Sequence, residues 1–185
     1  MSQFNRIGTV PNVLSFFRLL LLVPIMVSLV HGQRLWALLW MLIGLATDWL
    51  DGIIARRWDQ RSDLGRILDP VIDKVDVLVV CFYLVISPHY FFPLWYFLFL
   101  LIRELILTMC SLLVIRKKRM VMESNRQGKN SAFANGVVVI FFVLGLEPYS
   151  HMILWVAFAL TLYSSWVYLR LFLRQMQPKN SQGSR

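Results

Sequence analysis

Residues 48–73 read D-W-L-D-G-I-I-A-R-R-W-D-Q-R-S-D-L-G-R-I-L-D-P-V-I-D, and the chain is organised around this acidic stretch. All seven Asp of the chain lie between Asp48 and Asp76, and the only other acidic residues are Glu104, Glu123 and Glu147. The rest of the 185-residue chain is strongly apolar, since 58% of its residues are hydrophobic. In such a sequence we expect carboxylates to gather only where something compensates their charge.

The spacing of the acidic and small residues predicts two helices. The first helix carries a face with the spacing i, i+3, i+4, i+7 and i+8, formed by Asp48, Asp51, Gly52, Ala55 and Arg56. The second carries a face with the spacing i, i+4 and i+8, formed by Gly65, Asp69 and Asp73. The link between them is short and polar, so the two helices are expected to run antiparallel, side by side. Four carboxylates would then come together.

Four neighbouring carboxylates repel one another unless cations neutralise them. A site made only of oxygen ligands suits Mg²⁺, Ca²⁺ or Mn²⁺, whereas Zn²⁺ favours His and Cys. Gly52 and Ala55 leave room for a ligand to approach the helix backbone closely. The guanidinium of Arg56 fits the geometry of a phosphate group. Together these residues indicate a metal-dependent site for a diphosphate compound.

The same residues carry a resemblance to a known family. The pattern D-x2-D-G-x2-A-R-x8-G-x3-D-x3-D resembles the signature of the CDP-alcohol phosphotransferases, and all eight fixed positions match. An alternative is that the carboxylates are ion-paired helix ends, with basic partners nearby at Arg57, Arg61, Arg66 and Lys74. That alternative accounts for a single Asp but not for eight positions together, because ionisable residues within a membrane are usually functional.

The resemblance implies an enzyme that transfers a phosphatidyl group from CDP-diacylglycerol to an alcohol and releases CMP. It implies two divalent ions, Mg²⁺ or Mn²⁺, bound by Asp48, Asp51, Asp69 and Asp73, with Asp73 also the general base. The CDP-lipid would be held by Gly52, Ala55, Arg56 and Gly65. Most relatives are homodimers, so the resemblance implies a homodimer.

Long apolar runs predict an all-α integral membrane protein. We expect six transmembrane helices at about 13–30, 35–55, 67–86, 91–115, 131–146 and 151–172. Residues 1–175 are expected to form one membrane domain, and 176–185 a polar, disordered tail. The net charge of +9 does not indicate nucleic acid, because the basic residues lie between the apolar runs.

The basic residues also predict an orientation. An even number of spans places both termini on one side, and nearly all Lys and Arg lie in the segments of that side, whereas the opposite links hold only Arg34. The positive-inside rule therefore places both termini and the acidic stretch on the cytosolic side. We expect a protein of the bacterial-type cytoplasmic membrane whose active site faces the cytosol.

The acceptor is expected to carry a phosphate group. Gly128 and Lys129 resemble the Gly-Lys that opens the fifth helix in phosphatidylglycerophosphate synthases, although those relatives continue with a second Lys and a Thr where this chain has Ser131 and Ala132. Glycerol 3-phosphate is the favoured acceptor, bound by four basic residues: Arg103, Lys129, Arg116 and Arg126. Arg103 and Glu104 are equally open to a second interpretation, as an internal ion pair that orients the bundle.

Other functions remain open at this stage. Inositol phosphate and phosphatidylglycerol are alternative acceptors for the same chemistry. A divalent-cation transporter is an alternative of a different class, although the carboxylates lie away from the middle of the membrane and no inverted repeat is visible.

Overall fold

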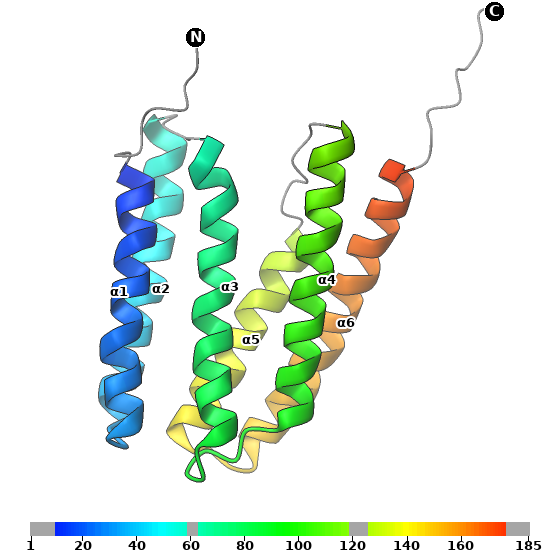
Figure 1. Ribbon diagram of the computed structural model, residues 1–185. Helices are drawn as coiled ribbons and strands as arrows, with labels where there is room; N and C mark the ends of the chain where they lie inside the picture. The colour runs from blue at the N-terminus through cyan, green and yellow to red at the C-terminus, as the bar shows by residue number, and fades with distance from the viewer. Residues whose placement is uncertain (1–9, 59–62, 119–125, 177–185) are drawn as a thin grey trace, which may run out of the picture. The chain divides into compact units, whose positions relative to one another are not determined.

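The computed structural model describes residues 10–58, 63–118 and 126–176, and within these ranges the chain is helical with short links. Figure 1 shows the six helices. They are α1 (Val10–Val30), α2 (Arg34–Trp58), α3 (Asp63–Ile86), α4 (Leu94–Lys118), α5 (Arg126–Leu144) and α6 (Tyr149–Met176). For the described residues, the predicted all-helical architecture with six helices is confirmed, whereas six membrane spans stay a prediction.

Five of the six helices are longer than the predicted spans, because polar residues extend them beyond the apolar runs. α4 has the predicted length but begins and ends three positions later, at Leu94 and Lys118. α3 begins at Asp63, four positions before the predicted start at about residue 67, so Pro70 lies about two turns into the helix. α5 begins at Arg126, five positions before the predicted start at residue 131. Hydropathy marks where a helix is apolar, whereas the helix itself continues as long as its backbone hydrogen bonds can form. The predicted tail lies outside the described residues, apart from Met176, which ends α6.

The chain divides into two compact units. Unit 1 is drawn from Met1–Phe92 together with Val139–Leu146, and unit 2 from Pro93–Val138 together with Glu147–Arg185. α5 therefore contributes its first part to unit 2 and its last turns to unit 1.

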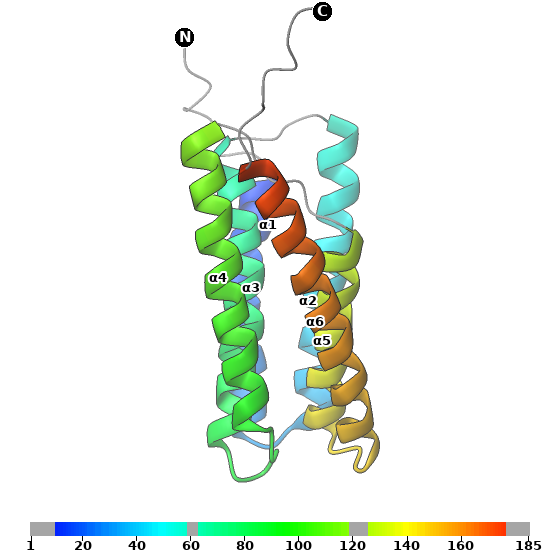
Figure 2. The same ribbon diagram turned by 90° about the vertical axis from the view of Figure 1, so that its right-hand side faces the viewer.

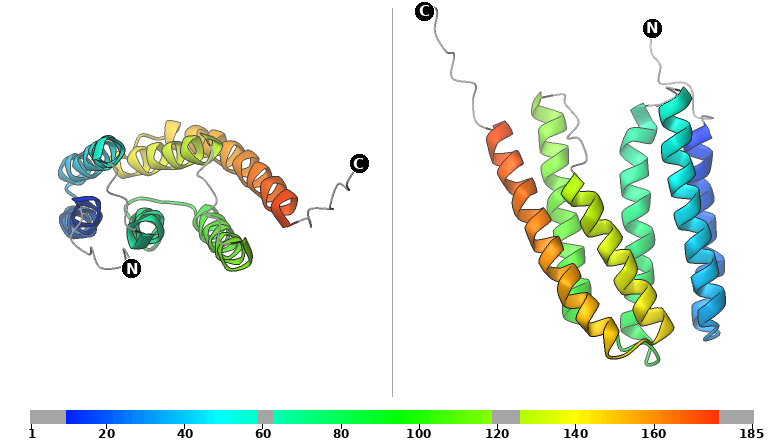
Figure 3. Two further views of the ribbon diagram at one scale, coloured as in Figure 1. Left: turned by 90° about the horizontal axis from the view of Figure 1, so that it is seen from above. Right: turned by 180° about the vertical axis from the view of Figure 1, so that it is seen from behind.

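In unit 1, α1 packs against both α2 and α3. Seen along the helix axes, α1 lies next to each of them (Figure 3). Leu21, Ile25 and Leu29 form the buried face of α1, at the spacing i, i+4 and i+8. They pack in a core that includes Ala37 and Leu84. We predicted that α2 and α3 would pack on each other; they do run antiparallel, but α1 is the main packing partner of both.

Two helices of unit 1 end in the same glycine-dependent motif. Gly145 has φ +69°, its N–H donates to the carbonyl of Phe142, and the N–H of Leu146 donates to the carbonyl of Phe141. Gly32, with φ +67°, ends α1 by the equivalent pair of bonds. This is the Schellman motif, which needs a left-handed residue after the helix, and glycine adopts that conformation without strain.

Arg34 joins three segments of unit 1. Its Nη1 donates to the carbonyl oxygen of Leu144 at 3.2 Å, and its guanidinium carbon lies 5.6 Å from the centre of the Tyr90 ring. The hydroxyl of Tyr90 in turn donates to the carbonyl oxygen of Leu29 at 3.1 Å. A side chain at Gly145 would overlap the guanidinium of Arg34. We call these contacts of Arg34, Tyr90, Leu29 and Leu144 the Arg34 clasp. It gives the carbonyl of Leu144 at the end of α5 a partner, and it gives the carbonyl of Leu29, which already accepts from the N–H of Gly32, a second donor.

In unit 2, α4 and α6 pack together and end at the same end of the unit (Figure 2). Near their beginnings an aromatic cluster joins them. The ring centres of Trp95 and Trp155 are 5.4 Å apart, and those of Phe99 and Phe158 are 4.8 Å apart. Edge-to-face and tilted pairs at these distances stabilise the contact beyond the area they bury.

One helix among the described residues is both long and apolar enough to cross a membrane, α6 over Tyr149–Arg174. Four shorter apolar helical stretches occur at Leu19–Val30, Arg34–Thr47, Val75–Ile86 and Asn130–Leu144.

Candidate functional site

The acidic signature occupies two helix ends in unit 1. Asp48 to Arg56 lie in the last turns of α2, and Gly65 to Asp73 lie in the first turns of α3. Figure 1 shows that α2 ends and α3 begins at the same end of unit 1. The helical backbone predicted for both halves of the signature is confirmed.

The register of these helices favours a shared site. At a rise of about 1.5 Å per residue, Asp48 and Asp51 are separated by about 4.5 Å along α2, and Asp69 and Asp73 by about 6 Å along α3. The side chains of the eight signature residues lie outside the described part of the structure, so the gathering of four carboxylates stays a prediction. Elsewhere, within the described residues, no group of three or more His, Cys, Asp and Glu side chains is placed to hold a metal ion.

Thr47 immediately precedes the signature. Its hydroxyl hydrogen-bonds to two carbonyls of its own helix, Gly44 O at 2.7 Å and Ile43 O at 3.1 Å. A threonine bonded back in this way is satisfied without a partner from another element, and such bonds often bend a helix slightly. Thr47 therefore has a local structural role at the point where α2 becomes acidic.

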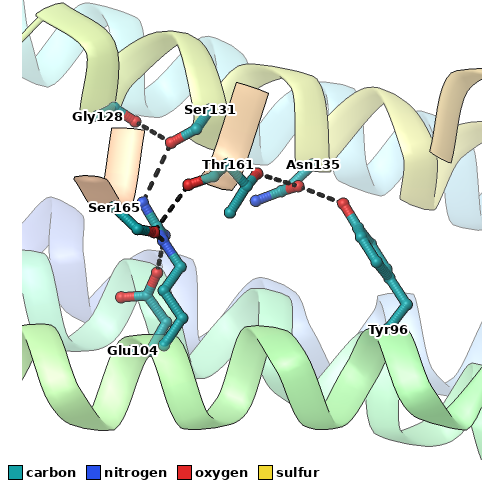
Figure 4. Close-up of polar contacts among 8 residues, drawn as sticks. Tyr96, Glu104, Gly128, Ser131, Asn135, Thr161 and Ser165 are labelled. Atoms are coloured by element: carbon teal, nitrogen blue, oxygen red, sulfur yellow. Dashed lines mark hydrogen bonds and ion pairs between the residues drawn. The ribbon is translucent and has the colours of Figure 1, made fainter. Parts of the chain in front are cut away.

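Arg103 of α4 is bonded to a polar cluster in unit 2, whose members Glu104, Ser131 and Ser165 are labelled in Figure 4. Its Nε donates to the hydroxyl of Ser165 on α6 at 3.1 Å, and its Nη2 donates to the hydroxyl of Ser131 on α5 at 3.2 Å. Its Nη1 forms an ion pair with the carboxylate of Glu104. The side chains of Arg103 and Glu104 are 10% and 16% exposed. The internal ion pair, one of the two interpretations of these residues, is therefore present.

The two serine hydroxyls that accept from Arg103 also form hydrogen bonds within their own helices. Ser131 donates to the carbonyl of Gly128 at 3.0 Å, and Ser165 donates to the carbonyl of Thr161 at 2.7 Å. Each serine hydroxyl thus donates its single proton to a carbonyl of its own helix and accepts a hydrogen bond from the guanidinium through a lone pair. The arrangement fixes Arg103 from three helices and leaves two of its five N–H groups for a further acceptor.

A second hydrogen-bonded group lies beside Arg103 in unit 2. The amide oxygen of Asn135 accepts from the Tyr96 hydroxyl at 2.7 Å and from the Thr161 hydroxyl at 3.3 Å. All three side chains are buried. Buried polar groups are retained when they are satisfied in this way, and here they tie α4, α5 and α6 together.

Sequence reasoning singled out Arg103 and Glu104 but missed most of the hydroxyls around them. The available signal was the i, i+4 spacing of Ser131 and Asn135, repeated by Thr161 and Ser165, within apolar runs. The other predicted acceptor residues lie at the end of α4 and in the first turn of α5: Arg116, Arg126 and Lys129. Their side chains lie outside the described part of the structure.

Comparison with known proteins gives a family match over most of the chain. Residues 8–163 match the CDP-alcohol phosphatidyltransferase family. A putative cardiolipin synthase of Mycobacterium tuberculosis (strain ATCC 25618 / H37Rv) is 31% identical over 173 residues, which is 91% of this chain and 81% of that protein.

Two further relatives match over a shorter range. The cardiolipin synthase (CMP-forming) of Streptomyces coelicolor is 39% identical over 57% of this chain and 51% of its own length. The CDP-diacylglycerol--glycerol-3-phosphate 3-phosphatidyltransferase of Escherichia coli (strain K12) is 38% identical over 48% of this chain and 47% of its own length. The matched region thus spans about half of each of these two relatives.

Proposed function

Because the chain belongs to the CDP-alcohol phosphatidyltransferase family, we propose that it transfers a phosphatidyl group from CDP-diacylglycerol to the hydroxyl of an acceptor alcohol. CMP is the leaving group. The observation that carries the proposal is the eight-residue signature, whose two halves are helical and lie at one end of unit 1.

The signature offers only oxygen ligands, which fits Mg²⁺ or Mn²⁺. Asp48, Asp51, Asp69 and Asp73 would hold two such ions, which would neutralise the diphosphate and the charge of the departing CMP. The turns of α2 before Asp48 support this assignment, because they hold no competing carboxylate; on α3 the next carboxylate after Asp73 is Asp76.

Asp73 is proposed as the residue that takes the proton of the attacking hydroxyl. No histidine lies near the signature in the sequence, so a carboxylate is the available base. Arg56 would bind a phosphate oxygen through its planar fork of N–H groups. Gly52, Ala55 and Gly65 would let the cytidine and the phosphates approach the backbone.

Glycerol 3-phosphate is the proposed acceptor, and its product is phosphatidylglycerol phosphate. Arg103, Arg116, Arg126 and Lys129 supply the positive charge that a phosphate monoester needs. The hydrogen bonds of Arg103 support its part in this proposal, because they hold the guanidinium in place and leave two N–H groups for an anion.

Phosphatidylglycerol is a second candidate acceptor, favoured by two observations. A relative whose match spans most of both chains is named a putative cardiolipin synthase. Ser131 stands where the phosphatidylglycerophosphate synthase pattern has a second Lys, and its neutral hydroxyl is buried against Arg103. The carboxylate of Glu104 offsets the charge of Arg103, which suits the single charge of a phosphodiester better than a dianion.

The enzyme is proposed to be embedded in the cytoplasmic membrane as a six-span domain of residues 1–175, active as a homodimer. Large apolar side chains are exposed along every helix, for example Val27, Leu39, Phe82, Ile102, Phe133 and Trp155. Such a surface would be unfavourable in water and is suited to lipid. The distribution of basic residues supports a cytosolic location of both termini and of the signature.

One experiment tests the reaction and the acceptor together. The purified protein is incubated with CDP-diacylglycerol and Mg²⁺, and with glycerol 3-phosphate, phosphatidylglycerol, inositol phosphate or free inositol. The lipid product is then identified by mass spectrometry. Phosphatidylglycerol phosphate supports the favoured acceptor, whereas cardiolipin supports the second. Absence of CMP release with every acceptor, together with metal flux into vesicles that lack the CDP-lipid, would favour a transporter instead.

A further inference from the structure

The outer face of α6 has the reverse of the polarity expected in water. The helix buries four small or hydroxyl-bearing residues and one leucine at the spacing of one helix face, namely Ser150, Ala157, Thr161, Ser164 and Leu154. It exposes large apolar residues on the opposite face, namely Met152, Trp155, Val156, Leu160, Tyr163, Trp166, Leu169 and Leu173. Only 22% of the most apolar part of the helix is buried. Small and polar residues inside, with large apolar residues outside, is the pattern of a helix that faces lipid.

This apolar face ends in two exposed arginines. Arg170 and Arg174 follow Trp166 at i+4 and i+8, so all three residues lie on one face of the helix. The guanidinium carbon of Arg170 lies 4.6 Å from the centre of the Trp166 ring, and the Trp166 side chain is 53% exposed. Stacking on the ring covers a flat side of the guanidinium and leaves its in-plane N–H groups directed outward.

The two arginines need an anion from outside the helix. α6 contains no Asp or Glu. Among the contacts of the described residues, neither Arg170 nor Arg174 takes part in a hydrogen bond or an ion pair. In contrast, the two other arginines whose side chains are described are both bonded, Arg34 to a carbonyl and Arg103 to Glu104. The stack on Trp166 thus holds Arg170 ready for a ligand that the described residues do not supply.

We propose that Trp166, Arg170 and Arg174 bind the phosphate headgroup of an anionic membrane phospholipid whose acyl chains lie along the outer face of α6. The apolar face and the two charges follow one another along the helix in the same order as the acyl chains and the headgroup of a lipid. Trp at a membrane interface and Arg near an anionic leaflet are both favourable. The residues of this binding site belong to unit 2, whereas the acidic signature belongs to unit 1.

Photolabelling of the full-length protein in phosphatidylcholine vesicles tests the proposal, which rests on the membrane position proposed above. Each vesicle preparation carries a trace of a photoreactive lipid, either phosphatidylserine or phosphatidylcholine, and a chelator keeps the metal-dependent reaction silent. Labelled peptides are identified by mass spectrometry. Each arginine near an anionic lipid strengthens its binding about 5-fold. We therefore expect the phosphatidylserine probe to label residues 163–174 at least about 5-fold more than the phosphatidylcholine probe. With the photoreactive group attached next to the headgroup of each probe, residues 152–160 at the other end of the same face should be labelled equally by both probes.

The variants separate headgroup binding from general lipid contact. R170Q/R174Q should bring the labelling ratio at 163–174 to about 1, whereas R170K/R174K should keep most of the preference. An equal ratio in the unchanged protein, or no loss in R170Q/R174Q, would overturn the proposal. Loss of the preference on addition of soluble glycerol phosphate would also overturn it, because the site would then bind free phosphate. No labelling of α6 by either probe would contradict the membrane position itself.

Discussion

At the scale of single residues, Arg103 shows how an apolar bundle accommodates a charge. The ion pair with Glu104 neutralises it, and Ser131 and Ser165 fix its direction from α5 and α6. Burial of an arginine in an apolar region is costly unless it is paired and hydrogen-bonded, so each of these contacts stabilises the native position of the side chain. The same contacts give the guanidinium of Arg103 a defined orientation.

The double substitution Ser131→Ala/Ser165→Ala should raise the KM for the acceptor about 10-fold, with the KM for CDP-diacylglycerol changed less than about 2-fold. Hydrogen bonds to a charged group contribute about 1.5–3 kcal/mol, and their loss lets the guanidinium leave its position. Steady-state kinetics with each substrate varied in turn measures the effect. The single variant Ser165→Thr keeps a hydroxyl at this position, so its KM for the acceptor should stay close to that of the unchanged protein.

Ser164→Ala is the matched control for this prediction. Ser164 is buried on the same helix, 5% exposed, and forms none of the hydrogen bonds described for Arg103. An equal rise of the acceptor KM in this control would mean that the effect comes from packing of α6. An unchanged KM in the double variant would show that Arg103 does not depend on the two hydroxyls.

Asp73→Asn should lower kcat by at least ~10²-fold, the lower end of the range for loss of a general base. The amide keeps the shape of the side chain but cannot accept the proton of the hydroxyl. The KM for CDP-diacylglycerol should change much less than kcat. A variant that loses CDP-lipid affinity while it keeps kcat would restrict Asp73 to metal binding.

At the scale of elements, the signature depends on two helix ends that α1 supports. α2 and α3 each pack on α1, so the position of the two acidic turns is set by the apolar core around Leu21 and Leu29. The sequence predicted the two helices and their antiparallel direction. It did not predict α1 as their common partner, because the spacing of residues on one helix does not identify the helix that it packs against.

Removal of divalent metal should abolish the activity of the α2–α3 site reversibly. Excess chelator should stop CMP release, and added Mg²⁺ or Mn²⁺ should restore it, because uncompensated carboxylates repel both one another and the diphosphate. Asp48→Asn and Asp69→Asn, one on each helix, should both be inactive while the thermal unfolding midpoint stays within a few degrees of the unchanged protein. Full turnover in excess chelator would rule out metal-assisted transfer.

The Arg34 clasp predicts a loss of stability at high pH. Burial raises the pKa of Tyr90 above its usual value near 10, and the neighbouring Tyr83 raises it further, while Arg34 partly offsets the rise. A raised pKa means that the fold favours the protonated phenol, which donates to Leu29 O. The stabilisation is therefore complete below about pH 10 and is lost as the pH rises through the higher pKa of the folded state.

Thermal unfolding in detergent between pH 8 and pH 11.5 checks this prediction. Tyr90→Phe should lower the midpoint at pH 8 and reduce its further fall above pH 10. Tyr149→Phe is the control, since that tyrosine is 61% exposed and its removal should leave the pH dependence unchanged. An identical fall in midpoint above pH 10 with and without Tyr90 would show that other groups cause it.

At the scale of the whole molecule, the order and number of helices could be predicted because each apolar run is bounded by Gly, Pro or charged residues. The helix ends could not, since polar residues such as Asp63 and Arg126 continue helices that hydropathy alone would end. The helical backbone of the candidate site could be predicted from the spacing of the signature residues. The hydrogen-bond partners of Arg103 could not be predicted, because a Ser or Thr in an apolar run does not indicate which helix its hydroxyl will contact.

The proposed topology predicts which links can be labelled from each side of the membrane. A cysteine at His89, in the link between α3 and α4, should react with an impermeant reagent added outside intact cells. A cysteine at Gln182 should react only after the membrane is opened. His89 is a better position than the link at 31–33, because it is exposed and takes no part in the Arg34 clasp. The reverse pattern of labelling would overturn the orientation and the cytosolic location of the acidic signature.

Because unit 1 is formed from two separate parts of the chain, its two parts are synthesised at different times. Arg34 and the carbonyl of Leu144 that it binds are 110 positions apart, and residues 93–138 of unit 2 are synthesised between them. At about 5–20 residues per second, the ribosome takes roughly 5–22 s to travel from one to the other. A chain released before Leu144 would carry all of the acidic signature and yet lack the carbonyl that Arg34 binds.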